Sequence, residues 1–351
     1  MVEYTMVLGD KGLSLGSLAT SIIEAGRTPV IITRNNTLED IHHCILNGLD
    51  NRDYTMLMVT EKPSIMLTEN DNSDVKVLNC YSTSFEEIVD YVNGGIIFSA
   101  CRDGLYRTYL PLLAPYITKP THICVFDNDP AVANTARQMN TNKYIQIHQC
   151  VAHSVCSAVQ YDHPNHTVYV TCGKDCILIF PPSCYNIKNE FKTSPIFDRS
   201  EFIFCDTDEM FNYYVTWKLI CINSMHSFAC VLAYTNGLKL GYSLDELSRK
   251  TFSELTEKSY VISYTLHIFS LLYDIHLASY AKLTNASKET YMDICTRFFD
   301  GLYNHNEYVG RGLDPKHSSF QAKLERHFPL LKESGDANVI KLLEDFEKTL
   351  A

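Results

Sequence analysis

The stretch Tyr4-Thr-Met-Val-Leu-Gly-Asp-Lys-Gly-Leu-Ser-Leu-Gly16 lies near the N-terminus. It contains a short run of β-type residues followed by glycines. An amphipathic segment, residues 17–25, comes next, and after it the apolar run Pro29-Val-Ile-Ile-Thr33. The order of strand, glycine turn, helix and second strand predicts a βαβ unit. This unit decides the fold, because it makes the N-terminal part of the chain an α/β domain built on a parallel sheet.

The glycine turn is the place where a Rossmann-like domain holds the pyrophosphate of a dinucleotide against a helix N-terminus. Gly9, Gly12 and Gly16 are therefore candidate cofactor-binding residues. Their spacing is Gly-x2-Gly-x3-Gly rather than Gly-x-Gly-x2-Gly, so an ordinary glycine turn before a helix is the alternative interpretation.

The end of the second predicted strand suggests which dinucleotide would bind. An NAD site usually presents an acidic residue to the ribose hydroxyls at this point, but the chain reads Thr33-Arg34-Asn-Asn36. A cation suits a 2′-phosphate, so Thr33 and Arg34 favour NADP(H) over NAD(H). A solvated loop arginine is the alternative.

Further β-type runs extend the predicted sheet, at residues 53–60, 76–80, 95–99 and 121–126. Two later runs, 167–171 and 176–180, flank Gly173-Lys-Asp and predict a β-hairpin with its turn at these residues. Beyond about residue 195 the pattern becomes helical almost throughout. We therefore predict an α/β Rossmann-like N-terminal domain, residues 1–195, and an all-α C-terminal domain, residues 196–351.

Composition narrows the class of protein. A chain of 351 residues with 46% hydrophobic and 20% charged residues is typical of a soluble protein of two domains. The formal net charge is −11 and no Lys/Arg-rich block occurs, which argues against a nucleic-acid or anionic-membrane partner. Since no signal-like N-terminus or membrane-length apolar run is evident, we expect a cytoplasmic protein, monomeric or weakly oligomeric.

The 13 cysteines are scattered through strand-like and helical runs, as reduced, buried thiols of a cytosolic protein are. A zinc site could be drawn from five residues on paper: Cys150, His153, Cys156, Cys172 and Cys176. No CxxC pair supports it, so we expect no metal.

The run Phe211-Asn-Tyr-Tyr-Val-Thr-Trp-Lys-Leu-Ile-Cys-Ile-Asn-Ser-Met-His-Ser-Phe-Ala-Cys-Val-Leu-Ala-Tyr234 reads as one mostly buried helix. Lys218, Asn223 and His226 interrupt its apolar pattern. At 100° per residue His226 lies about 80° from Lys218 and about 60° from Asn223, so the three could line one cavity. A desolvated lysine can act as a base while amide and imidazole donors hold a developing alkoxide, which suits hydride transfer at a carbinol carbon. A core helix with a snorkelling lysine and a satisfied histidine is the alternative.

The spacing Lys-x4-Asn-x2-His resembles the long-chain mannitol dehydrogenase family, which includes mannitol 2-dehydrogenases, mannitol-1-phosphate 5-dehydrogenases and uronate reductases. The resemblance implies that Lys218 is the general base and that Asn223 and His226 bind the reacting oxygen. It adds Asn128 of Asp127-Asn128 as a fourth catalytic residue, although an Asx-type helix cap before Pro130 can hold at the same time. It also implies that Ser99 lies on the nicotinamide side of the cleft.

The chain departs from that family at its Val-Asp-Arg element, where the nearest match is Cys150-Val-Ala-His153. His153 is kept as a candidate substrate-binding residue. Arg311, in the glycine-rich segment Tyr308-Val-Gly-Arg-Gly-Leu-Asp-Pro315, is a candidate anion clamp, with a helix–helix turn as the alternative.

Together these patterns predict a metal-independent oxidoreductase. It would transfer hydride between NAD(P) and a polyol, a keto-sugar, a sugar phosphate or a related hydroxy acid. A catalytically inactive Rossmann-fold descendant that senses a ligand or binds a protein is the alternative. A third interpretation is another two-domain dehydrogenase, such as an opine or hydroxy-acid enzyme.

Overall fold

The computed structural model describes residues 4–9, 12–19, 21–22, 25–33, 55–59, 65–67, 76–79, 89, 93–162, 167–191, 200–280, 287–304, 306–316 and 320–350. Side chains are not described at residues 28, 33, 55–59, 65–67, 76–79, 154–162, 167–175 and 200–201. The chain forms two compact units, Met1–Phe211 and Asn212–Ala351. The predicted domain limits, 1–195 and 196–351, stay a prediction.

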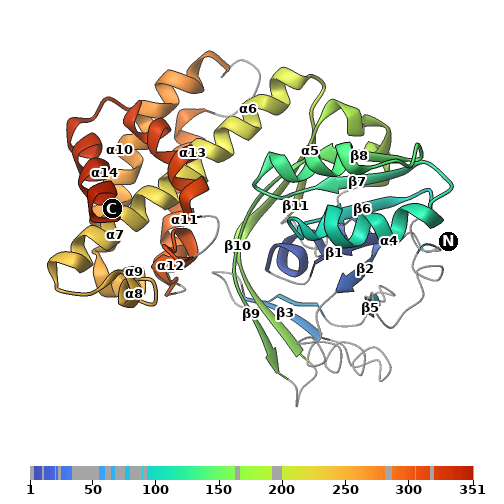
Figure 1. Ribbon diagram of the computed structural model, residues 1–351, viewed down its shortest axis with the longest axis horizontal. Coiled ribbons are helices and arrows are strands. Elements are labelled where there is room, and N and C mark those ends of the chain that lie inside the picture. Colours follow the sequence, from blue (N-terminus) through green and yellow to red (C-terminus); the bar gives the residue numbers. More distant parts are fainter. Residues whose placement is uncertain are drawn as a thin grey trace. The chain divides into compact units, whose positions relative to one another are not determined.

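The first unit is built on a six-stranded parallel sheet with the order β5-β2-β1-β6-β7-β8 (Figure 1). Its strands are β1 (Tyr4–Leu8), β2 (Thr28–Thr33), β5 (Lys76–Asn79), β6 (Ile96–Ser99), β7 (Thr121–Val125) and β8 (Ile145–Gln149). If these six strands are numbered along the chain, their order across the sheet is 3-2-1-4-5-6, which is the doubly wound Rossmann order. The predicted Rossmann-like domain is confirmed, with its topological switch point between β1 and β6.

Both faces of this sheet are covered, as its continuous apolar strands require. Alternate residues of β1 point to opposite faces, so Met6 and Leu8 enter one core and Val7 the other. Helical segments cover the Met6 face, namely η3 (Leu105–Tyr109), α4 (Leu110–Leu113), η4 (Ala114–Tyr116) and α5 (Pro130–Met139). The segment from η3 to η4 is divided into short pieces, and prolines lie at the starts of α4 and η4.

A second sheet, with the path β11-β10-β3-β4 and β9 paired to β10, contributes to the other core. Its strands are β3 (Thr55–Val59), β4 (Ile65–Leu67), β9 (Val151–Asp162), β10 (Thr167–Phe180) and β11 (Ser200–Phe204). Phe126, the residue after β7, meets Phe180 of β10 edge-on, with ring centroids 5.6 Å apart. The π-helix η1 (Ser14–Ala19) is buried in the same core through Leu15 and Leu18.

The predicted hairpin at Gly173-Lys-Asp is wrong. Residues 167–180 form one strand, β10, which pairs antiparallel with β9, so the hairpin's two strands are β9 and β10. The register shifts between Thr171 and Cys172 and again between Cys172 and Cys176, which marks a bulge or irregularity at Gly173-Lys-Asp. A turn and a bulge draw on the same residue types, so the local sequence did not separate them.

Apart from a bridge between Thr251 and Tyr308, the described residues of the second unit form helices and the turns between them, as predicted. Its first helical stretch runs from α6 (Asp208–Lys218) through the π-helix η7 (Leu219–Ser224) into α7 (Met225–Lys239). The other segments are α8 (Leu244–Leu247), α9 (Phe252–Leu255), α10 (Lys258–His276), η8 (Ala278–Tyr280), α11 (Lys288–Asn304), α12 (Val309–Gly312), α13 (Phe320–Lys332) and α14 (Ala337–Leu350). Buried residues follow one another through α7 from Ser227 to Tyr234, so this helix is the centre of the unit.

One helical stretch in the described residues, Asp208–Lys239, is long and apolar enough to cross a membrane, with a mean hydropathy of 1.3 in its most apolar window. That window is 67% buried inside the protein, as the core helix of a globular unit would be.

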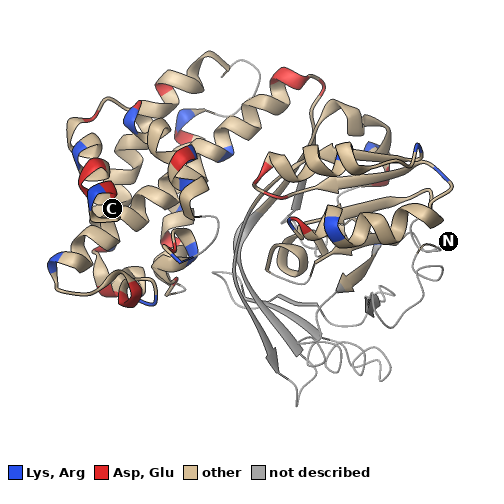
Figure 2. Cartoon of the chain, in the orientation of Figure 1, with Lys and Arg blue, Asp and Glu red and all other residues tan. Residues whose placement is uncertain are grey.

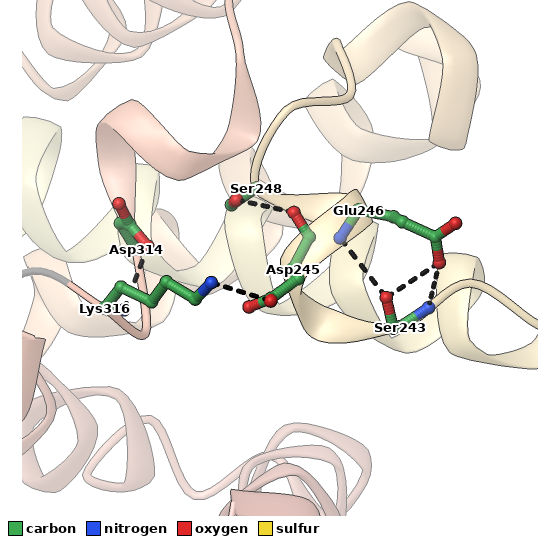
Figure 3. A network of polar contacts seen from close by, with 6 residues as sticks. All are labelled: Ser243, Asp245, Glu246, Ser248, Asp314 and Lys316. Carbon is green, nitrogen blue, oxygen red and sulfur yellow. Dashed lines mark hydrogen bonds and ion pairs between the residues drawn. The ribbon is translucent and has the colours of Figure 1, made fainter.

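In the described part of the chain, Lys, Arg, Asp and Glu residues lie mainly on helices and turns (Figure 2). β1, β6 and β7 contain no Lys, Arg, Asp or Glu. In the second unit a polar network fixes the start of α8 to the segment after α12 (Figure 3). Ser243 and Glu246 form a capping box, and Lys316 reaches Asp245 with 2.6 Å between Nζ and Oδ2.

Candidate functional site

The carboxyl ends of β1, β6 and β7 bring three of the predicted site residues to one edge of the sheet. Ser99 at the end of β6 is paired with Leu8 and with Val125. The Ala100 N–H donates to Leu8 O at 3.2 Å, and the Phe126 N–H donates to Ser99 O at 2.8 Å. Gly9, Ser99 and Asn128 therefore follow or end adjacent parallel strands, at the place where doubly wound folds bind ligands.

Gly9 is required by its backbone. Its φ is +120°, and a Cβ built there would lie 2.6 Å from Ser14 Oγ. Ser14 is 1% exposed, and its Oγ has no hydrogen-bond partner among the described residues. Without a side chain at Gly9, a pyrophosphate could approach the backbone closely. The buried Ser14 hydroxyl, which lacks a hydrogen-bond partner among the described residues, lies beside it. Gly12 precedes η1 and Gly16 is buried within it.

Asp127 shapes the same edge. Its carboxylate accepts the Arg102 N–H at 3.1 and 3.2 Å, and Arg102 has a positive φ of 55°. Asn128 is exposed and lies three residues after the end of β7. The predicted Asx cap before Pro130 is made by Asp129, whose Oδ1 accepts the Ala131 N–H at 3.0 Å, so Asn128 is not the capping residue.

The remaining predicted cofactor contacts are Ser99, Thr33 and Arg34. The Ser99 side chain is buried, and its Oγ lies 3.3 Å from Cys101 Sγ, so its backbone is the part that faces the edge. Thr33 is the last residue of β2 and pairs with Asn79. Arg34, the basis of the NADP preference, lies outside the described residues.

The Lys218 helix changes its winding just after the lysine. Lys218 is the last residue of α6, and Asn223 lies within η7, where hydrogen bonds run from i to i+5. Residues five apart are neighbours on such a turn, as residues four apart are on an α-helix. In a regular α-helix the side chains of Lys218 and Asn223 would point about 140° apart around the helix axis. The π-turn reduces this angle and so brings Asn223 toward the helix face that carries Lys218.

His226 lies inside the second unit. Its ring centroid is 5.3 Å from that of Phe298 and 6.0 Å from that of Phe252. Its Nε2 has no partner among the described residues, and a Cβ on Gly312 would come within 2.6 Å of that atom. Burial, with nearby Lys323, lowers the pKa of His226 to about 3, so the ring is neutral. These surroundings make His226 a core residue of the helical unit.

The two candidate substrate residues lie in different units. Arg311, in α12, forms an ion pair with Glu307, which precedes that helix, with 3.1 Å between Nε and Oε1. Burial raises the pKa of Glu307, although Arg311 opposes that effect. His153 is 5% exposed and sits opposite Ile177 in the β9–β10 pair. Glu307 and Ser14 are two residues that the sequence analysis missed, and neither carries a local signal, because each gains its role from a contact made by folding.

Comparison with known proteins places this geometry in a fold class. No protein-family model matches the chain, and a search of curated proteins also finds no match. Among solved structures, the fold is that of the ketopantoate reductases: a Rossmann-like domain followed by a helical one.

Three solved structures carry this likeness over nearly the whole chain. The 2-dehydropantoate 2-reductase of Geobacter metallireducens matches with a TM-score of 0.53 and 13% identity, over 99% of each chain. A PanE/ApbA family ketopantoate reductase of Ralstonia eutropha matches at 0.50 and 12%, over 99% of this chain and 98% of that one. D-mandelate dehydrogenase with NADH and anilino(oxo)acetate matches at 0.50 and 11%, over 99% of each chain.

The resemblance to the mannitol dehydrogenases is therefore wrong, because the matching folds are those of ketopantoate reductases and D-mandelate dehydrogenase. The error has a physical origin. A lysine and two polar residues on an apolar helix are not specific to one family of dehydrogenases. In addition, angles calculated at 100° per residue assume a regular α-helix and do not hold across a π-turn.

Proposed function

We propose that this protein is a nicotinamide-dependent oxidoreductase that interconverts a 2-oxo acid and a 2-hydroxy acid. The observation that carries the proposal is the parallel sheet with Rossmann order whose switch-point strand ends at Gly9. The substrate class follows the solved structures with this fold, whose names are those of 2-oxo-acid and 2-hydroxy-acid enzymes. A 2-oxo acid therefore replaces the polyol as the first substrate to test.

The residues that would hold the dinucleotide are Gly9, Gly12 and Gly16 beside the pyrophosphate and the Ser99 backbone near the nicotinamide. Thr33 and Arg34 would meet the ribose or its 2′-phosphate, which keeps NADP(H) as the favoured form. When bound, a nicotinamide supplies or accepts the hydride.

Proton transfer would fall to Lys218. Its Nζ would take the proton from the substrate hydroxyl during oxidation and return it during reduction. Asn223, brought toward the same helix face by η7, would donate a hydrogen bond to the reacting oxygen. Because His226 Nε2 lies beneath Gly312, we propose that His226 positions α7 and does not contact substrate.

The first experiment is a titration of the purified chain with NADPH and with NADH, followed by nicotinamide fluorescence. We expect micromolar binding of at least one, with NADPH preferred. If neither binds at about 1 mM, the oxidoreductase proposal fails.

A second experiment tests the roles of two cations. Lys218→Met should lower turnover of 2-oxo acids by about 100-fold or more while leaving dinucleotide affinity nearly intact, and a near-normal rate would remove Lys218 as the base. Arg34→Ala should weaken NADPH far more than NADH. Equal losses would mean that Arg34 is only a solvated loop residue.

A second candidate function is a non-catalytic descendant that binds a ligand without turning it over. The observation that favours it is the burial of His226, which leaves Lys218 and Asn223 as the polar pair on that helix. Dinucleotide binding without turnover of any 2-oxo acid, hydroxy acid or polyol would support this function.

A further inference from the structure

Three cysteines from separate segments meet in the core of the first unit. Cys124 is in β7, Cys150 directly follows β8, and Cys184 is in the 3-10 helix η6 (Pro182–Glu190). Their Sγ atoms all lie within 4.8 Å of one another. Each is buried, with at most 1% of the residue exposed. Three sulfur atoms therefore converge on one point from three segments.

The spacing is close to that of a metal centre. Three thiolates on one zinc ion, with Zn–S bonds of about 2.3 Å, lie about 3.8 Å apart. The observed limit of 4.8 Å is within about an ångström of this, a change that rotation about side-chain bonds can supply. Thiolate sulfur is a soft ligand that favours zinc and Cu(I) over magnesium or calcium.

A candidate for the fourth ligand is His148, in β8, which is 4% exposed and contacts Ser183, the residue before Cys184. Its Nδ1 is 2.8 Å from Ser183 Oγ, and its Nε2 is 3.0 Å from His122 Nδ1. A histidine that binds zinc through one nitrogen usually holds a polar partner at the other, and His122 is in place for that role.

We propose that Cys124, Cys150 and Cys184, with His148 as the fourth ligand, form a structural zinc site between β7, β8 and η6. On binding, Zn²⁺ replaces the protons of the three thiols, and His148 exchanges its hydrogen bond to Ser183 for the metal. The set differs from the one drawn from the sequence, which shared only Cys150 with it. The site would join η6 to the parallel sheet.

The test uses the full chain, reduced and free of oxygen. Titration with Co²⁺ should give thiolate-to-cobalt absorption bands that saturate at about one ion per chain and that Zn²⁺ removes. X-ray absorption of the zinc-loaded wild type should show three Zn–S bonds at about 2.3 Å and one Zn–N bond at about 2.0–2.1 Å. Absence of cobalt bands would overturn the proposal, and so would a zinc shell without sulfur.

Variants locate the ion. Cys184→Ser should abolish the bands, and His148→Gln should weaken zinc affinity about 10–100-fold. Cys176→Ser is the matched control, because Cys176 is fully buried in the same core but contacts Ser21 Oγ at 3.3 Å. Equal loss in the control would mean that the bands report core damage, which would overturn the assignment. If Cys184→Ser does not fold, the wild-type absorption data decide.

Discussion

At the scale of single residues, Gly9 carries the clearest constraint in the first unit. Its positive φ suits glycine, and Ser14 Oγ and Ala100 O occupy the space that a side chain would enter. The glycine pattern in the sequence identified the turn. It did not indicate which glycine the backbone requires or that Ser14 would be buried beside it, because both depend on how the strand ends meet.

Gly9→Ala is the first predicted change. We expect it to weaken dinucleotide binding about tenfold or more and to destabilise the protein by about 1–2 kcal/mol, because a left-handed backbone opposes a Cβ. Gly26→Ala is the matched control: Gly26 also has a positive φ, of 75°, but a Cβ there meets nothing within 4 Å. Fluorescence titration and thermal unfolding of both variants measure the two effects. Equal loss of affinity in both would show that strain, and not position, is responsible.

His226 leads to a prediction about pH. Its pKa is lowered to about 3 in the folded protein, against about 6.5 when unfolded, so the unfolded chain binds more protons between these values. Its stabilising contribution is complete above pH 6.5 and is lost as the pH falls toward 3. At pH 5 the loss is about 2 kcal/mol.

His226→Gln should therefore flatten the fall in unfolding free energy between pH 6.5 and pH 4, measured by urea denaturation. His267→Gln, at a side chain that is 55% exposed, is the control. His327 is also buried, with its pKa lowered to about 4, so part of the slope should remain. An unchanged slope in the His226 variant would mean that water reaches its ring.

At the scale of elements, the short helix α12 is held against α7 by the absence of a side chain at Gly312. A Cβ there would contact Cys230 Sγ and lie 2.6 Å from His226 Nε2. The Cys230 thiol also donates to Val309 O at 3.4 Å, and Tyr234 donates to Leu313 O. The glycine-rich sequence around Arg311 is thus a packing element, whatever else Arg311 does.

Gly312→Ala should destabilise the second unit by about 1–3 kcal/mol, because the core must move to admit the methyl group. Adding Cys230→Ala should recover part of that loss by making room on α7. Chemical denaturation of the single and double variants provides the measurement. If Cys230→Ala instead increases the loss of stability, the methyl group of Gly312→Ala does not clash with Cys230.

At the scale of the whole molecule, the two units allow a ligand to be assigned to one of them. The chain has one tryptophan, Trp217, which is buried in α6 against Tyr291 of the second unit, with ring centroids 5.6 Å apart. Its fluorescence therefore reports on the helical unit, while circular dichroism reports on both.

We expect saturating NADPH to raise the midpoint of thermal unfolding followed by circular dichroism. A ligand at about 100 times its Kd adds about 2.7 kcal/mol to the unit that binds it. If the first unit alone holds the dinucleotide, the Trp217 transition should shift less. Equal shifts by both probes would mean that the units unfold together or share the ligand.

The sequence by itself determined the classes of structure. Strand, glycine turn and strand at 4–33 predicted an α/β start, and the helical pattern of the second half predicted an all-α domain. The limit predicted at about residue 195 stays a prediction, and one strand, β11, lies beyond it at Ser200–Phe204. An apolar helix carrying Lys218 was also evident. These features are local: a period of two or of 3.6 residues and a glycine turn are each complete within some 15 residues.

Only the tertiary structure decided which distant segments meet. Contacts between residues far apart in the chain decided the strand order, the pairing of β9 with β10 and the convergence of Cys124, Cys150 and Cys184. Packing that overrides local preference decided the π-turn after Lys218. The mannitol dehydrogenase interpretation failed for the same reason, because it extended a local spacing to a whole site. Long-range pairing is selected by the total burial and hydrogen bonding of the fold, to which no short stretch of sequence has access.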